Sequence, residues 1–192
     1  MMPLSARLAV LFVLLVSTSL PLVSTQAQEF VWAPALPVGS TLPPIDAVDQ
    51  NGQRHTLADL TGSKGLILIM SRSFDWCPYC KVQLERMQAA QEQFAALGYS
   101  LAAMTYDPIA TLKEAEEEHG TSMPLLSDED TRHVTAMGIL NTQYSPGERA
   151  YGIPYPGIFV IDAQGVIRAK LAEEDYKVRP DVSLVLETVS AL

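Results

Sequence analysis

Cysteine and basic residues are scarce in this sequence, and each shortage excludes a class of protein. The chain has 192 residues and 2 cysteines, too few for a disulfide-rich scaffold or a four-cysteine zinc site. It has 13 basic against 22 acidic residues and a formal net charge of −9, whereas a nucleic-acid-binding protein needs a basic face for the phosphates. Internal repeats and low-complexity tracts are also lacking. The 48% hydrophobic content excludes a disordered chain, and the length suits one domain with a short extra segment.

The N-terminal segment has the pattern of a secretory signal peptide. Residues 1–7 contain one basic side chain, Arg7, and no acid, and residues 8–16 carry no polar side chain. Small residues then occupy Thr25 and Ala27, the two positions that a signal peptidase reads. We therefore expect residues 1–27 to be a signal peptide that is removed on export.

Export places the mature protein in a periplasmic or other extracytoplasmic compartment, where disulfides persist. Cleavage after Ala27 leaves 192 − 27 = 165 residues. The alternative is an uncleaved membrane anchor over residues 4–23, which is long enough to span but is weakened by residues 17–19 and Pro21. Only that alternative would attach the protein to a membrane.

Strands alternate with helices along the rest of the chain. The patterns predict an extended lead-in (28–37), a hairpin turn (49–52), strands (66–70, 99–105, 124–126, 157–161 and 166–171), helices (78–97, 107–119, 127–138 and 181–192) and an irregular segment (141–156). Ser127 is the expected cap of the third helix, with acids at 128–130 in its first turn. This order predicts a largely parallel sheet with helices on its faces and an antiparallel edge near the C-terminus.

The two cysteines stand at the predicted start of the first long helix, in Trp76-Cys77-Pro78-Tyr79-Cys80. At the cap position, the sulfur of Cys77 is expected to face solvent and the free N–H groups of the first turn, which stabilise a thiolate. Such placement can lower a cysteine pKa from about 8.5 to between roughly 3.5 and 7.5. Cys80 lies on the core-facing stripe. We therefore expect Cys77 to exchange with the substrate and Cys80 to resolve the mixed disulfide.

Two other interpretations of the cysteine pair are weaker. A purely structural disulfide would close a loop of four residues, which removes little entropy from the unfolded chain. A metal site would need further ligands, but His55, His119 and His133 show no ligand spacing to one another or to the cysteines. We therefore expect neither a metal nor a cofactor.

The strand–WCPYC–helix arrangement resembles the thioredoxin superfamily. Residues 38–60 resemble the opening of its redoxin branch, which includes AhpC/TSA peroxiredoxins and exported TlpA/ResA-type oxidoreductases, and residues 156–167 resemble the late strand pair of that branch. The resemblance covers residues 38–192. It implies an α/β, thioredoxin-like fold there: a central mixed sheet flanked by helices, with an N-terminal hairpin extension and a central αβ insertion.

The resemblance also implies substrate-binding residues. Tyr155-Pro156 matches the cis-proline of the family, which lies against the cysteine pair and offers backbone groups to an incoming peptide. Tyr155 would then touch the substrate. Trp76 matches the aromatic neighbour of the first cysteine. The alternatives are that Pro156 is an ordinary turn proline and that Trp76 is a packing residue.

The sequence departs from the resemblance at several positions. Peroxiredoxins carry a proline seven residues before the peroxidatic cysteine and a threonine or serine three before it, where this chain has Met70 and Phe74. Their peroxide-polarising arginine falls near Pro156. Thioredoxins have a buried acid six residues before the first cysteine, where this chain has Ser71. The peroxide-activating cluster is therefore not visible, and the proton relay of thioredoxins is in doubt.

The leading functional hypothesis is an exported thiol-disulfide oxidoreductase that exchanges its Cys77–Cys80 pair with protein thiols. Its partners would be protein clients and an unidentified thiol electron donor, with reduction of the client as the expected direction. Arg72 and Lys81 should favour the thiolate, and Asp75 should oppose it. One alternative is a thiol-dependent peroxidase of the AhpC/TSA type. Another is a non-catalytic module similar to copper chaperones, although those use a wider cysteine spacing and a distal histidine.

Overall fold

The computed structural model describes residues 30–192. The expected signal peptide, residues 1–27, and the first two residues of the expected lead-in lie outside the described residues. Within 30–192, no helix is both long enough and apolar enough to cross a membrane.

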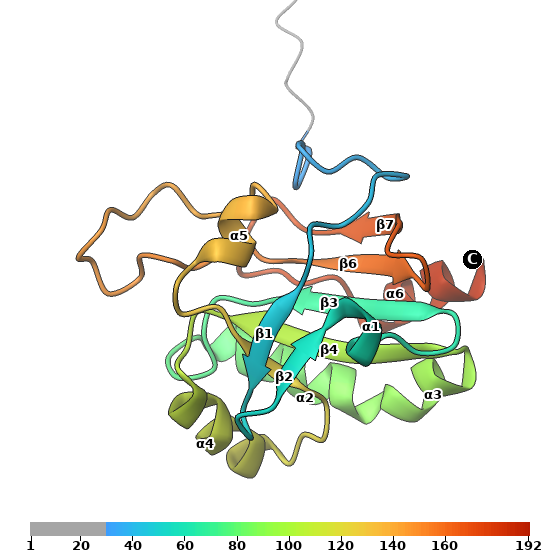
Figure 1. Cartoon of the computed structure of the whole chain (residues 1–192), viewed down its shortest axis with the longest axis horizontal. Helices are drawn as coiled ribbons and strands as arrows, with labels where there is room; N and C mark the ends of the chain where they lie inside the picture. The colour runs from blue at the N-terminus through green and yellow to red at the C-terminus, as the bar shows by residue number, and fades with distance from the viewer. Residues whose placement is uncertain (1–29) are drawn as a thin grey trace, which may run out of the picture.

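One mixed sheet of seven strands organises residues 30–192 (Figure 1). Its order is β2-β1-β5-β4-β3-β6-β7. The strands are β1 (Asp46–Asp49), β2 (Arg54–Thr56), β3 (Gly65–Met70), β4 (Tyr99–Thr105), β5 (Leu125–Ser127), β6 (Gly157–Asp162) and β7 (Ile167–Leu171). The helices are α1 (Leu57–Leu60), α2 (Pro78–Ala89), α3 (Gln91–Ala96), α4 (Ile109–His119), α5 (Arg132–Ala136) and α6 (Val182–Ser190). The expected hairpin is β1–β2, and the α4–β5 unit supplies the strand between β1 and β4.

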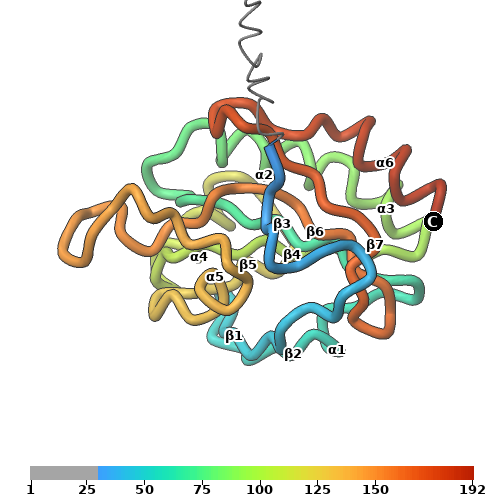
Figure 2. The backbone as a smooth tube through the Cα atoms, turned by 90° about the horizontal axis from the view of Figure 1, so that it is seen from above, coloured from blue at the N-terminus to red at the C-terminus, as the bar shows by residue number. Residues whose placement is uncertain are grey.

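The sheet is covered on both faces, which is why β3 is apolar throughout. Ile67 and Ile69 point into a core cluster shared with α2, α3, α4 and α6. Leu66, Leu68 and Met70 point the other way, into a cluster with α1, α5 and the N-terminal segment. Figure 2 shows α3 and α6 on one side of the sheet and α1 on the other. Strand β3 lies parallel to β4 and antiparallel to β6, which confirms the mixed sheet that the resemblance implies. The expectation of a largely parallel sheet is wrong, because the pairs β1–β2, β1–β5, β3–β6 and β6–β7 are antiparallel and only β3–β4 and β4–β5 are parallel.

The segment before residue 38 is not an extended lead-in. Residues 30–37 form bends and turns, and Trp32 is 6% exposed. Its ring stacks on Phe159 with centroids 4.4 Å apart, and it covers Gly157 so closely that a Cβ there would lie 2.5 Å from the indole. The long apolar and aromatic side chains of this segment complete the second core cluster, so the segment packs against the domain.

The expected helix over 78–97 is broken at Ala90. Its apolar stripe makes five repeats in 17 residues, whereas five turns of an α-helix need 18. A straight helix would therefore rotate the stripe by about 100° away from the core. Ala90 leaves helical geometry (φ −99°, ψ 4°), and α2 and α3 both keep their buried side chains in the same cluster.

Ser127 does not cap α5, contrary to expectation. It ends β5, where it pairs with Thr105, and α5 begins only after Thr131. Asp128, which precedes the helix, caps it instead: its carboxylate accepts hydrogen bonds from the backbone N–H groups of His133 and Val134 at 3.0 and 2.9 Å. The other predicted helices and strands are confirmed to within two residues. The irregular segment 141–156 extends past α5 (Figure 1).

Candidate redox site

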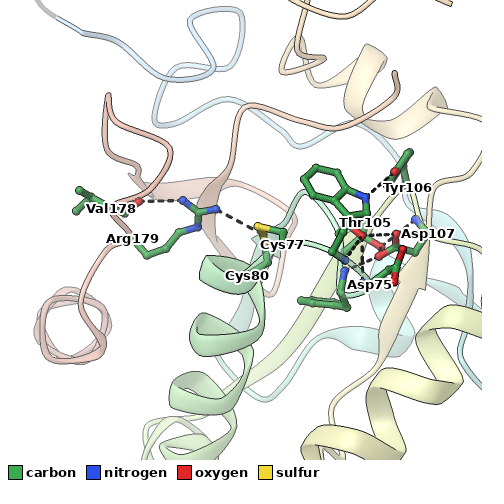
Figure 3. The surroundings of a disulfide bond; sticks show 11 residues. Asp75, Cys77, Cys80, Thr105, Tyr106, Asp107, Val178 and Arg179 are labelled. Atoms are coloured by element: carbon green, nitrogen blue, oxygen red, sulfur yellow. Dashed lines mark hydrogen bonds between the residues drawn. A yellow bond between two sulfur atoms is a disulfide. The ribbon is translucent and has the colours of Figure 1, made fainter. Parts of the chain in front are cut away.

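The cysteine pair lies where the chain leaves the central strand and enters α2. Cys77 is the N-cap residue of α2, and Pro78 occupies the first turn, where it has no N–H to leave unpaired. Cys77 and Cys80 are joined by a disulfide, with their Cα atoms 5.3 Å apart (Figure 3). The local sequence therefore places both sulfurs at the positive end of the helix dipole, where a thiolate is stabilised.

Both sulfurs are buried, and for Cys77 the prediction was wrong. Cys77 is 1% exposed and Cys80 is 0% exposed. The reason is that the loop before the helix folds inward: Phe74 joins Cys77 in the first core cluster, and Trp76 packs against that cluster. A partner can therefore reach the Cys77 sulfur only after neighbouring side chains move aside.

A buried carboxylate holds the loop that leads to the cysteines. Asp107 is 3% exposed and accepts hydrogen bonds from the Phe74 backbone N–H at 2.6 Å and the Ser73 hydroxyl at 2.8 Å. The Thr105 hydroxyl donates a third, at 2.9 Å. Burial raises the pKa of Asp107 because it disfavours the charged form. In the sequence, Asp107-Pro108 indicates only the start of a helix. In the structure Pro108 is the N-cap of α4, and the Asp107 carboxylate binds the cysteine loop instead.

The raised pKa of Asp107 makes stability depend on pH with a defined sign. Between its unfolded and folded pKa values the folded state binds more protons, so this contribution to the free energy of unfolding falls as pH rises. We expect the difference in unfolding free energy, wild type minus Asp107→Asn, to decrease from about pH 4 upward. Urea titrations at a series of pH values measure it.

Asp181→Asn is the matched control with the opposite sign. Asp181 caps α6, and its hydrogen bonds from Ser183 lower its pKa. Its stabilising contribution is present above the unfolded pKa and is lost as pH falls through the folded one. The unfolding free energy of wild type minus that of Asp181→Asn should therefore increase with pH. Parallel pH curves for the two variants would contradict the assignment.

Two arginines near the cysteine loop have no carboxylate partner in the described part of the chain. Nη2 of Arg179 lies 3.5 Å from Sγ of Cys80, and Nη1 donates to the Val178 carbonyl at 3.0 Å (Figure 3). Arg72 is 7% exposed, with its guanidinium 5.0 Å from the Trp76 ring centroid and 4.3 Å from that of Tyr176. Within residues 30–192, no ion pair includes Arg72 or Arg179.

The positive charge of Arg179 matters most when the disulfide is reduced and Cys80 can become a thiolate. Burial, with the charge of Arg72 second, lowers the pKa of Arg179 to about 10, so it remains a cation at neutral pH. A thiolate on Cys80 would supply the anion that the Arg179 guanidinium lacks. A charge-assisted hydrogen bond from Arg179 to that thiolate is stronger than its contact with a neutral sulfur. The site is therefore arranged to stabilise the reduced, ionised form.

Lys81 and Asp75, whose charges were expected to act on the cysteine pair, form ion pairs with other residues. Lys81 pairs with Glu118 at 3.2 Å, and Asp75 pairs with Arg149 at 3.3 Å. Arg179 takes the place expected for Lys81. It stands 99 residues after Cys80, in a segment with no motif, so nothing in the sequence pointed to it.

Trp76 has a packing role in the structure. It is half-buried against the core cluster, and its indole N–H donates to the Tyr106 hydroxyl at 2.9 Å. That hydroxyl in turn donates to the Arg149 carbonyl at 3.0 Å. Trp76 thus links the cysteine loop to the irregular segment 141–156 and also stacks with Arg72.

The match of Tyr155-Pro156 to a cis-proline is wrong, because every peptide bond in the described part of the chain is trans. The Tyr155 N–H donates to the Ile139 carbonyl at 2.7 Å, and its carbonyl accepts the Trp32 indole N–H at 2.9 Å. The backbone of Tyr155 is therefore already occupied and not free for a peptide. Pro156 is buried beside Gly157, which pairs with Met70 at the start of the cysteine loop. The 38% exposed Tyr155 side chain remains accessible.

No group of three or more His, Cys, Asp or Glu side chains in residues 30–192 is arranged to hold a metal ion. The histidines instead bind carboxylates: His55 contacts Asp49 at 2.8 Å, and His133 contacts Asp128 at 2.7 Å.

The family model described as AhpC/TSA matches residues 38–170. The chain belongs to the AhpC/TSA family. Family membership and the Cys77–Cys80 disulfide together make this AhpC/TSA protein an oxidoreductase that acts on thiols.

Relatives of this AhpC/TSA protein carry two kinds of name. Alkyl hydroperoxide reductase E of Mycobacterium tuberculosis is 28% identical over 157 residues, covering 82% of this chain and 98% of that protein. Thiol-disulfide oxidoreductase ResA of Geobacillus thermodenitrificans is 27% identical over 157 residues, covering 79% and 80%. The crystal structure of peroxidoxin BcpB from M. tuberculosis shares the fold, with a TM-score of 0.70, 20% identity, and coverage of 82% and 98%.

Proposed function

We propose that this protein is an exported thiol-disulfide oxidoreductase that exchanges its Cys77–Cys80 pair with protein thiols. The observation that carries the proposal is the disulfide at the N-cap of α2 with the Arg179 guanidinium 3.5 Å from its second sulfur. A structural crosslink across two intervening residues would gain little from such an environment. A cysteine pair that cycles between disulfide and dithiol benefits from this environment, because the environment stabilises the thiolate of the reduced form.

The exchange transfers two electrons. The Cys77 thiolate attacks one sulfur of a client disulfide, forms a mixed disulfide and releases the other client sulfur as a thiolate. The Cys80 thiolate then attacks the Cys77 sulfur, which forms the Cys77–Cys80 disulfide and releases the second client sulfur. The client gains two electrons and takes up two protons. A dithiol donor reverses these steps and restores the reduced pair.

Reduction of the client is the proposed direction. The resemblance to exported TlpA/ResA-type oxidoreductases supports it, as does the similarity to a protein named thiol-disulfide oxidoreductase ResA. Arg179 acts against strong reducing power, because its contact with Cys80 stabilises the reduced form of the pair. We therefore propose a moderate reductant of client disulfides, recharged by a thiol donor.

Export is the second part of the proposal. It rests on the basic start, the apolar run and the small residues at 25 and 27. Intact-mass measurement of the protein recovered from the extracytoplasmic fraction of the producing cells should show a chain that begins at residue 28. A full-length chain retained in the membrane fraction would establish the anchor instead.

The decisive test of the enzymatic proposal measures insulin reduction and, on the same samples, peroxide consumption. Wild type, with dithiothreitol as donor, should accelerate the reduction of insulin disulfides, and Cys77→Ser should show no acceleration. Ser122→Ala, which removes an exposed hydroxyl that contacts Gln88 in the last turn of α2, at the other end of the helix from the cysteines, should behave as wild type. Equal insulin reduction by wild type and Cys77→Ser would refute the proposal.

The second candidate is a thiol-dependent peroxidase, which the similarity to alkyl hydroperoxide reductase E favours. In that reaction Cys77 would attack a peroxide and release the alcohol, and Cys80 would condense with the Cys77 sulfenic acid to form the disulfide and water. Peroxide consumption in the presence of donor separates the candidates. Equal, slow consumption by wild type and Cys77→Ser removes the peroxidase, whereas rapid wild-type consumption without insulin reduction replaces the first proposal.

A further inference from the structure

A cavity of ≈ 360 Å³ lies next to the redox pair, between α2 and residues 177–182. We call it the α2 cavity. Three cationic residues line it, Arg86, Lys177 and Arg179, and no acidic residue does. This is a local excess of positive charge in a chain whose formal net charge is −9. Such a concentration of one sign attracts and orients an anion.

Gln83 supplies a second, independent observation. It lines the α2 cavity and is only 4% exposed, yet its Nε2 and Oε1 atoms are buried and have no hydrogen-bond partner in residues 30–192. A buried amide without partners is costly. The neighbouring Nε of Arg179 is also buried and without a partner. Because these atoms are closed to solvent, a rotation of the Gln83 side chain towards the cavity would let its amide donate to an oxygen acceptor bound there.

The rest of the α2 cavity is apolar. Its walls include Val82, Met87, Val178 and Val182. At about 30 Å³ for the share of one water in the liquid, its volume corresponds to about a dozen heavy atoms. The cavity therefore fits a small molecule with one anionic end and a short apolar body.

We propose that the α2 cavity binds a small aliphatic carboxylate of about a dozen heavy atoms. The carboxylate lies among Arg86, Lys177 and Arg179 and accepts a hydrogen bond from the Gln83 amide after that side chain rotates towards it. The aliphatic chain packs on Val82, Val178 and Val182. The site does not overlap the sulfurs, since neither Cys77 nor Cys80 lines the cavity.

Arg179 connects this site to the redox pair, and this coupling rests on the proposed function. The same residue lines the α2 cavity and contacts Cys80. A carboxylate and a Cys80 thiolate compete for its guanidinium, so the ligand should bind the oxidised protein more tightly than the reduced protein. By reciprocity, the ligand lowers the reduction potential.

Isothermal titration of the purified, oxidised protein with decanoate tests the site. We expect saturable binding at one site, about tenfold weaker binding for Arg86→Gln and again for Lys177→Gln, and binding at least tenfold weaker for decanol, which lacks the charge. Arg168→Gln is the matched control, because it removes an exposed arginine on β7 that pairs with Asp162. Absence of saturable binding, or equal affinity in Arg86→Gln and Arg168→Gln, would overturn the proposal.

Gln83→Leu provides a readout that separates binding from structure. Replacing an unsatisfied buried amide by an apolar side chain of similar size should raise or preserve the melting temperature, while decanoate affinity falls about tenfold. A variant that loses stability but keeps affinity contradicts the site. Insulin reduction by the same variants is scored separately, so loss of the ligand site and loss of the redox function are distinguishable.

Discussion

Cys80→Ser protein is expected to hold client proteins as mixed disulfides through Cys77, whereas Cys77→Ser protein should hold none. The reason is positional. Cys77 occupies the N-cap of α2, and Cys80 lies one turn further along the stripe that faces the core. Without Cys80, release of the client depends on an external thiol instead of a neighbouring sulfur. Loss of a well-oriented intramolecular step slows release by several orders of magnitude.

Trapping is measured on non-reducing gels of extracytoplasmic extract, with the captured partners identified by mass spectrometry. The Cys77→Ser/Cys80→Ser double variant is the background control. Cys80→Ser has no partner for an internal disulfide, so its Cys77 is kept as a free thiol until it meets the client disulfides. Stronger capture by Cys77→Ser than by Cys80→Ser would reverse the roles and contradict the assignment.

Arg179→Met is expected to lower the reduction potential of the pair by about 30–60 mV, which corresponds to a ten- to hundredfold change in the exchange equilibrium. The sign follows from the charges. The guanidinium stabilises a thiolate on Cys80 and has little to gain from the neutral disulfide, so its removal disfavours the dithiol form. Methionine retains much of the length of the arginine side chain, which limits the packing change. Equilibration with glutathione redox buffers measures the potential.

Two further variants isolate the charge at Arg179. Arg179→Lys keeps a cation and should shift the potential less than Arg179→Met. Arg168→Met removes an exposed arginine that pairs with Asp162 and should leave the potential near that of wild type. An unchanged potential in Arg179→Met, or a rise, would show that the contact with Cys80 has no electrostatic role. The ultraviolet absorbance of the thiolates, followed against pH, should show a raised thiol pKa in Arg179→Met.

Much of the fold was predictable because its signals are local. The uninterrupted apolar residues of β3 indicate a strand buried on both faces, and β3 is that strand. The turn residues at 49–52 predict the β1–β2 hairpin. The errors arose where a local signal competes with packing: Ala90 interrupts a helix whose stripe does not match 3.6 residues per turn, and Asp128, not Ser127, caps α5.

By itself, the sequence determined the order of helices and strands, the position of two cysteines at a helix start and their ability to form a disulfide, because these depend on residues close together in the chain. Only the tertiary structure decided the surroundings of that pair. Arg179 and Asp107 reach it from distant segments, and Trp32 occupies the Tyr155 carbonyl expected to be free for a peptide. The physical reason is that burial and charge depend on which segments the sheet brings together, and no local pattern records this.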